Sequence, residues 1–106
     1  MPGVIRGRVV KAPQGSKVNE YLGIPFARPP VGDLRYRDPV RLDKLPTDPY
    51  EATDQKYSCM QLLDTRFGSF EGSAMWNAPI ERREDCLYLN VWTPRSRGKK
   101  AVMVYT

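Results

Sequence analysis

The stretch EDCLYLNVWTP, residues 84–94, carries the clearest strand pattern in the chain. Alternation along it divides the side chains into two sets, which are Leu87, Leu89 and Val91 on one face and Tyr88, Asn90 and Trp92 on the other. Such a period of two is typical of a β-strand, because successive side chains point to opposite faces. Pro94 lacks a backbone N–H group, so we expect the strand to end there.

Upstream of this strand, GVIRGRVV (residues 3–10) and KVNEYLGIPFA (residues 17–27) predict two further extended segments. The connecting KAPQGS, residues 11–16, has the composition of a turn. Downstream, RSRGKK is a hairpin-type connection into AVMVYT, residues 101–106, whose continuous apolar character predicts a strand covered on both faces.

A terminal strand of this kind needs neighbours, because its apolar side chains and unpaired amides would otherwise be exposed. The sequence contains no long amphipathic helix that could cover it. We therefore expect residues 1–106 to be the N-terminal segment of a larger α/β protein. In that segment, strands and loops should predominate and the central sheet should be incomplete.

Proline and glycine dominate the middle of the chain. Pro29, Pro30, Gly32 and Pro39 argue against regular structure in residues 27–39. The following segment, 40–57, contains further prolines and is predicted to be a long surface excursion. After it, we expect at most a short helical turn around 60–64.

Composition excludes several classes of function. The net charge of +5 comes from scattered basic residues, with no interleaved aromatic and basic module, so we expect no nucleic-acid partner. No apolar run approaches the ~18 residues of a membrane span, and the opening lacks the apolar core of a secretory signal. With 106 residues, the chain is one small domain at most.

The chain contains no histidine. A Ser–His or Cys–His nucleophile therefore cannot be completed within it, and no serine lies in a G-x-S-x-G context. His-liganded metal sites are excluded as well, and two cysteines cannot close a structural zinc site. We predict no catalytic residue, no metal and no cofactor in this chain, and no activity for the chain alone.

Cys59 and Cys86 bound a segment rich in glycine and serine, residues 59–86. Two buried thiols would be the default for an intracellular protein. The segment has little regular structure to hold it, however, and closing it would contribute about 3 to 4 kcal/mol in the chain-entropy model. These considerations favour a bridge between the two cysteines and an oxidising compartment.

Several motifs together resemble the N-terminal signatures of the type-B carboxylesterase and cholinesterase family. They are YLGIPFARPPVGDLRYRDP (21–39), EAT (51–53) and EDCLYLNVWTP (84–94). The resemblance extends from about Gly7 to Tyr105, and within the family residues 64–77 are most similar to the acetylcholinesterase branch. It implies an α/β-hydrolase fold, hydrolysis of choline or other carboxylic esters, and a secreted or cell-surface location. The serine, acid and histidine would lie later in the chain, in the remainder of the hydrolase domain.

The resemblance also implies roles for individual residues. Residues 59–86 would form a disulfide-closed Ω-loop lining an active-site gorge, with Trp76 as the choline-binding residue. Asp64 would be the acid near the gorge mouth, and Ser73 and Asn77 would be polar gorge positions. Arg35 and Glu84 would form a buried structural salt bridge at the base of the loop.

Alternatives to these roles remain open at this stage. Trp76 could fill the gap beneath its own loop, Asp64 could be an N-cap or a surface acid, and loop hydrogen bonding could account for Ser73 and Asn77. Leu62 and Ala74 depart from the tyrosine and glutamate that the family commonly carries. As a whole, the protein could instead be a non-catalytic cholinesterase-like adhesion protein or a broad-specificity carboxylesterase.

Overall fold

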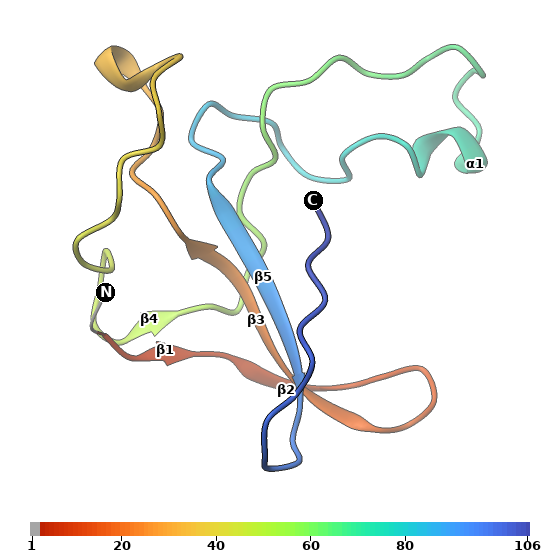
Figure 1. The fold of residues 1–106 in the computed structure, drawn as a ribbon. Coiled ribbons are helices and arrows are strands. Elements are labelled where there is room, and N and C mark those ends of the chain that lie inside the picture. The colour runs from red at the N-terminus through yellow and green to blue at the C-terminus, as the bar shows by residue number, and fades with distance from the viewer. Residues whose placement is uncertain (1–2) are drawn as a thin grey trace.

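The computed structural model describes residues 3–106 and consists mostly of strands and loops, as the sequence predicts (Figure 1). The elements in chain order are β1 (Ile5–Arg6), β2 (Arg8–Lys11), β3 (Lys17–Pro25), the 3-10 turn η1 (Gly32–Leu34), β4 (Tyr50–Glu51), α1 (Glu71–Ala74) and β5 (Tyr88–Pro94). No helix among the described residues has the length and apolar character to span a membrane.

The larger sheet has three antiparallel strands in the order β2-β3-β5. β2 and β3 form a hairpin whose turn is closed by a hydrogen bond of 2.8 Å from the amide of Gly15 to the carbonyl of Ala12. β5 pairs with the other edge of β3 and ends at Pro94, which lies opposite Val18. The three strands and the turn predicted for this part of the chain are therefore confirmed.

A bulge interrupts the pairing of β3 with β5 between Tyr21 and Ile24. Gly23 occupies it with a φ of +68°, in the left-handed region that favours glycine. The Gly23 amide donates to Asn90 Oδ1 at 2.8 Å, and its carbonyl accepts a hydrogen bond from the Tyr50 hydroxyl at 2.7 Å. Side chains of β5 and β4 therefore satisfy the backbone groups that the bulge removes from the ladder.

The second sheet joins β1 to β4 in parallel and contributes the core. Its buried cluster consists of Leu45, Tyr50 and Ala52, against which Ile5, Tyr21 and Ile24 pack. The prediction that 40–57 is a surface excursion is wrong, because this segment supplies all three buried members of the cluster. Prolines prevent a long strand there, but two paired residues of β4 suffice to hold the segment against β1.

Replacing Tyr50 by phenylalanine should lower the free energy of unfolding by about 1 to 2 kcal/mol. The buried carbonyl of Gly23 would lose its hydrogen-bond donor while the ring still filled its place in the core. Chemical denaturation of the two proteins measures the difference. Tyr36→Phe is a matched control, because the Tyr36 side chain is fully exposed, and an equal loss in both variants would contradict the assignment.

Three local predictions differ from the structure. Residues 101–106 do not form a strand and are exposed, because no pairing to them is present among the described residues. The short helix is α1, whereas 60–64 is irregular, since the Asp64 amide is bonded to the side chain of Asn77. The proline-rich segment 27–39 contains η1, because its prolines lie outside the turn and leave every turn amide free to donate.

Candidate functional site

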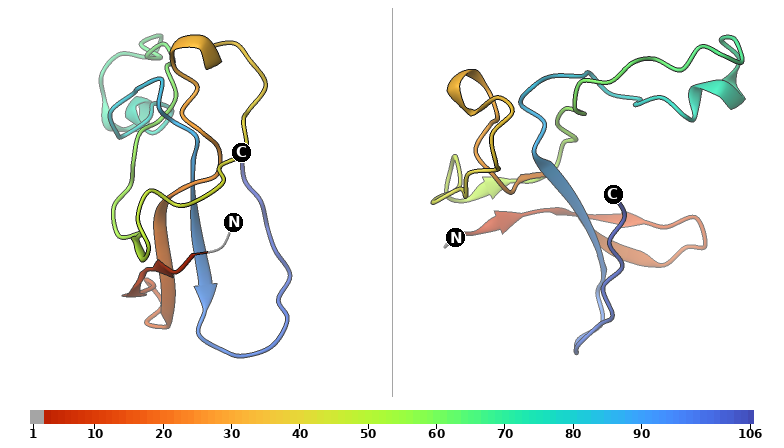
Figure 2. Two further views of the ribbon diagram at one scale, coloured as in Figure 1. Left: turned by 90° about the vertical axis from the view of Figure 1, so that its left-hand side faces the viewer. Right: turned by 45° about the horizontal axis from the view of Figure 1, so that its top comes forward.

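A disulfide between Cys59 and Cys86 closes the base of the loop 59–86, as predicted. Their Cα atoms lie 4.9 Å apart. Next to the disulfide, the Ser58 amide donates to the Glu81 carbonyl and the Arg83 amide donates to the Ser58 carbonyl, both at 3.0 Å. The loop extends outward from this base, beyond the start of β5 (Figures 1 and 2).

Arg35 and Glu84 form a bidentate ion pair, which joins the residue after η1 to the base of the loop. Arg35 Nε donates to one carboxylate oxygen of Glu84, and Nη2 donates to the other at 2.8 Å. Glu84 thereby raises the pKa of the Arg35 guanidinium.

The predicted burial of this pair is wrong, because 52% of the Arg35 side chain and 41% of the Glu84 side chain are exposed. Both residues line an open cleft of about 610 Å³ together with Pro30, Tyr36 and Met60. Among the described residues nothing covers the pair, so its contribution to stability is that of a surface ion pair, about 0 to 1 kcal/mol.

Arg83 adds a further contact at the base. Its guanidinium lies 4.0 Å from the centre of the Tyr57 ring and pairs with Glu81 at 2.8 Å. Arg83 therefore links the segment before Cys59 to the segment before Cys86 through a cation–π contact.

Asn77 connects the two arms of the loop further out. Its Oδ1 accepts from the Asp64 amide at 2.7 Å, and its Nδ2 donates to the Asp64 carbonyl at 3.0 Å. The side chain therefore acts as a cross-link between positions 13 residues apart. These bonds fix the backbone of Asp64 beside the residue that follows Trp76.

The Asp64 carboxylate is engaged by Arg66. It accepts hydrogen bonds from the Arg66 amide at 3.0 Å, from Nε at 3.2 Å and from Nη2 at 2.8 Å. The side-chain hydrogen bond, followed by the backbone one, holds the pKa of Asp64 below its usual value. Sequence analysis missed Arg66, although an arginine two residues after an aspartate is a spacing at which such a local pair can close.

α1 places Ser73 and Trp76 differently. The Phe70 carbonyl accepts from the amides of Ser73 and Ala74, and the Trp76 amide donates to the Ser73 carbonyl at 3.2 Å. Ser73 is only 3% exposed, whereas Trp76 is 72% exposed. The alternative in which Trp76 fills the gap beneath its own loop is therefore contradicted.

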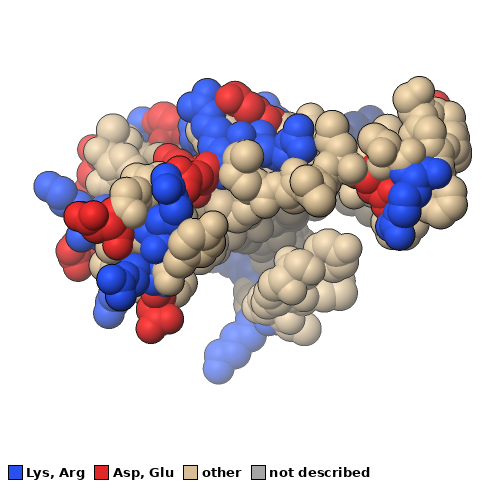
Figure 3. All heavy atoms as spheres, turned by 90° about the horizontal axis from the view of Figure 1, so that it is seen from above, with Lys and Arg blue, Asp and Glu red and all other residues tan. Residues whose placement is uncertain are grey.

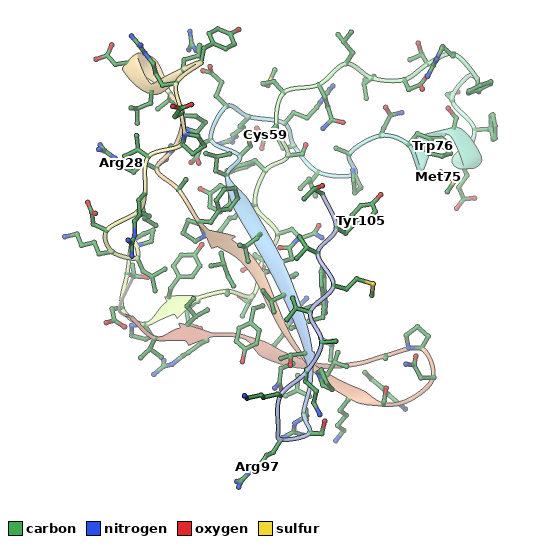
Figure 4. All side chains as sticks on the ribbon, in the orientation of Figure 1. Arg28, Cys59, Met75, Trp76, Arg97 and Tyr105 are labelled. Carbon is green, nitrogen blue, oxygen red and sulfur yellow. A yellow bond between two sulfur atoms is a disulfide. The ribbon has the colours of Figure 1, made fainter. Side chains whose placement is uncertain are left out.

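Trp76 belongs to a group of exposed apolar side chains that we call the apolar tip, namely Leu62, Leu63, Phe67, Phe70, Met75 and Trp76. Seen from above, uncharged side chains cover most of the projecting end of the molecule, with basic and acidic groups among them (Figure 3). Figure 4 shows Trp76 and Met75 beside α1 at the outer end of the loop, with Cys59 at its base. The loop thus carries an indole ring that solvent reaches.

The chemistry available to these residues is binding. Because the chain has no histidine, none of its hydroxyl or thiol groups can be paired with an imidazole base. Within residues 3–106 no cluster of three or more carboxylate or cysteine side chains is suited to hold a metal ion. An exposed indole can bind an organic cation through its negative face.

Comparison with known proteins places the chain in a family. The sequence profile described as "Carboxylesterase family" matches residues 1–106. Acetylcholinesterase of Gallus gallus is 48% identical over 94 residues, which are 88% of this chain and 12% of that protein.

Two further relatives agree with this result. Cholinesterase of Mus musculus is 49% identical over 92 residues, or 86% of this chain and 15% of the relative. Acetylcholinesterase 1 of Caenorhabditis briggsae is 46% identical over 103 residues, or 93% and 16%. The chain therefore spans between 12% and 16% of the length of these three relatives. On this match, and with the expected disulfide in place, the chain is a member of the carboxylesterase family.

Proposed function

We propose that residues 1–106 are the N-terminal part of an α/β-hydrolase domain that hydrolyses carboxylic esters of the choline type. In this proposal the loop 59–86 supplies the choline-binding wall of the active site, and the nucleophile and its histidine come from the remainder of the domain. The observation that carries the proposal is the exposed Trp76 ring on a loop closed by a disulfide.

The physical basis is the way a quaternary ammonium interacts with water and with aromatic rings. Its charge is shielded by methyl groups, so a single carboxylate cannot hold it by hydrogen bonds. The face of an indole attracts such a cation by about 0.5 to 2 kcal/mol, depending on desolvation. A ring in the core could not offer that face, whereas Trp76 at the end of α1 can.

Asp64 and Asn77 enter the proposal as supports of this wall. Asn77 cross-links the two arms of the loop next to Trp76, and Asp64 is the acid whose backbone it binds. Ser73 is buried within α1, and we assign it a supporting role. The disulfide and the family of the relatives favour a secreted or cell-surface location.

Replacing Trp76 by alanine in the full-length protein, with the rest of the proposed hydrolase domain present, tests the proposal. The ratio of kcat/KM for acetylcholine to kcat/KM for its uncharged isostere 3,3-dimethylbutyl acetate should fall by about two- to thirtyfold, the range of one cation–π contact. Steady-state kinetics with both esters measures this ratio.

Met75→Ala is the matched control, because Met75 is a neighbouring side chain of similar exposure without an aromatic face. An unchanged ratio in the Trp76 variant would remove the choline wall from the proposal and leave a broad-specificity carboxylesterase. Absence of hydrolysis of either ester by the parent protein would favour the adhesion alternative.

A further inference from the structure

We infer that Arg66 is a specificity-determining residue, which pairs with Asp64 and cancels its negative charge beside Trp76. This pairing would then lower the preference for cationic choline esters over esters with an uncharged alcohol group by about two- to fourfold. This inference rests on the proposed function, because it concerns the substrate class of the same loop.

The geometry of the pair supports charge cancellation. Arg66 reaches Asp64 with its amide and with two guanidinium nitrogens, at 2.8 to 3.2 Å. Both carboxylate oxygens are engaged, Oδ1 by the amide and Nε, and Oδ2 by Nη2. A carboxylate bound in this way presents a compact, nearly neutral pair to an approaching ligand.

The position of the pair supports an effect on ligands of Trp76. Asn77 follows Trp76 directly and is bonded through its side chain to both the amide and the carbonyl of Asp64. The Asp64 side chain is only 26% exposed, whereas the Arg66 side chain is 80% exposed. A ligand coming from solvent therefore meets the arginine before it meets the acid.

Other charges near the apolar tip do not replace the cancelled one. Between residues 60 and 80 the charged side chains are Asp64, Arg66 and Glu71, and the Arg82 guanidinium donates to the Gln61 carbonyl at 2.8 Å and keeps its charge in every variant. Glu71 begins α1 and is exposed, and its charge is the same in every variant considered below. A comparison of variants at Arg66 therefore isolates the effect of the pair.

The expected effect is modest and depends on salt. A unit charge about 10 Å from a cationic ligand changes its affinity about twofold in water and about fourfold at an effective dielectric constant of about 40, between the values for water and for a protein surface. Screening reduces this effect, because the Debye length falls from about 30 Å at 0.01 M salt to about 3 Å at 1 M.

The experiment replaces Arg66 by glutamine in the same full-length protein. At about 0.01 M salt, the acetylcholine to 3,3-dimethylbutyl acetate ratio of kcat/KM should rise about two- to fourfold, and the rise should vanish at about 1 M. Arg66→Lys keeps the charge and should retain the parent ratio. The double variant Asp64→Asn with Arg66→Gln should lose the gain.

Arg97→Gln is the matched control. It removes the same charge from the turn after β5, at the opposite end of the molecule from Trp76 (Figure 4). An equal rise in this control, or no rise in Arg66→Gln at low salt, would overturn the inference. Since Arg66 is exposed, its replacement is not expected to impair folding.

Failure of the proposed function gives a different pattern. If Trp76→Ala changes the ratio and Arg66→Gln does not, the choline wall stands and the inference falls. If Trp76→Ala has no effect, or if the protein hydrolyses neither ester, a binding experiment tests the inference instead. Tryptophan fluorescence then measures the affinities of the parent and of Arg66→Gln for phenyltrimethylammonium and for its uncharged isostere tert-butylbenzene. A higher affinity of Arg66→Gln than of the parent for the cationic probe alone supports the inference. Equal affinities of the two proteins for that probe overturn it.

Discussion

Replacing Gly23 by alanine should lower the free energy of unfolding by about 2 to 5 kcal/mol. Two effects add at this position. A non-glycine residue in the left-handed region costs about 1 to 2 kcal/mol, and overpacking of a close contact costs about 1 to 3 kcal/mol. A Cβ at Gly23 would lie 2.6 Å from the Asp54 carbonyl oxygen and 2.5 Å from Lys56 Cγ.

The overpacking arises because the backbone at Asp54 passes close to Gly23 at the bulge. The Lys56 side chain can move, but the Asp54 carbonyl belongs to the backbone that follows β4 and cannot move independently of it. Displacing it would also strain the hydrogen bond from the Leu22 amide to the Ala52 carbonyl, which is 2.8 Å long. The bulge and the buried cluster should therefore be disturbed together.

Gly32→Ala provides the matched control for this prediction. Its φ of +57° is close to that of Gly23, but a Cβ there would have no atom within 4 Å. Urea denaturation of both variants should show a loss of about 1 to 2 kcal/mol for Gly32→Ala and a clearly larger loss for Gly23→Ala. Equal losses would mean that the close approach of Asp54 does not restrict this position.

Removing the disulfide should have an effect of similar size. Replacing Cys59 and Cys86 by serine frees a loop with a sequence separation of 27 residues. The chain-entropy model gives a loss of about 3.5 kcal/mol in the free energy of unfolding for a loop of this length. Apart from the Asn77 cross-link and the contacts at the base, little holds the segment, because α1 spans four residues and the apolar tip is exposed.

This prediction is checked by comparing the parent and the double serine variant in urea, each with and without a reducing agent. The parent should lose stability on reduction, and the variant should be indifferent to the reductant. The Ser58–Glu81 and Arg83–Ser58 backbone hydrogen bonds do not depend on the disulfide, so we expect them to hold part of the base together in the variant. A parent protein as stable reduced as oxidised would contradict the assigned role of the bridge.

Local chemistry determined much of the fold. Alternation in residues 87–92 and the proline at 94 set the extent of β5, and the glycine and serine of residues 11–16 set the hairpin between β2 and β3. The composition of residues 59–86 favoured the disulfide, and the absence of histidine excluded a self-contained nucleophile. Each of these results depends on neighbours in the sequence or on an inventory of residue types, and both can be read directly from the chain.

The tertiary structure alone decided which residues meet across long separations. It brought Tyr50 to Gly23, gathered the core from the segment 40–57, and left the Arg35–Glu84 pair exposed. At the loop, it exposed Trp76, buried Ser73 and set Arg66 on the carboxylate of Asp64. Burial and pairing depend on how distant segments pack against one another, which residue patterns do not specify. For that reason the sequence predicted the disulfide-closed loop, whereas only the tertiary structure showed that Arg66 pairs with Asp64.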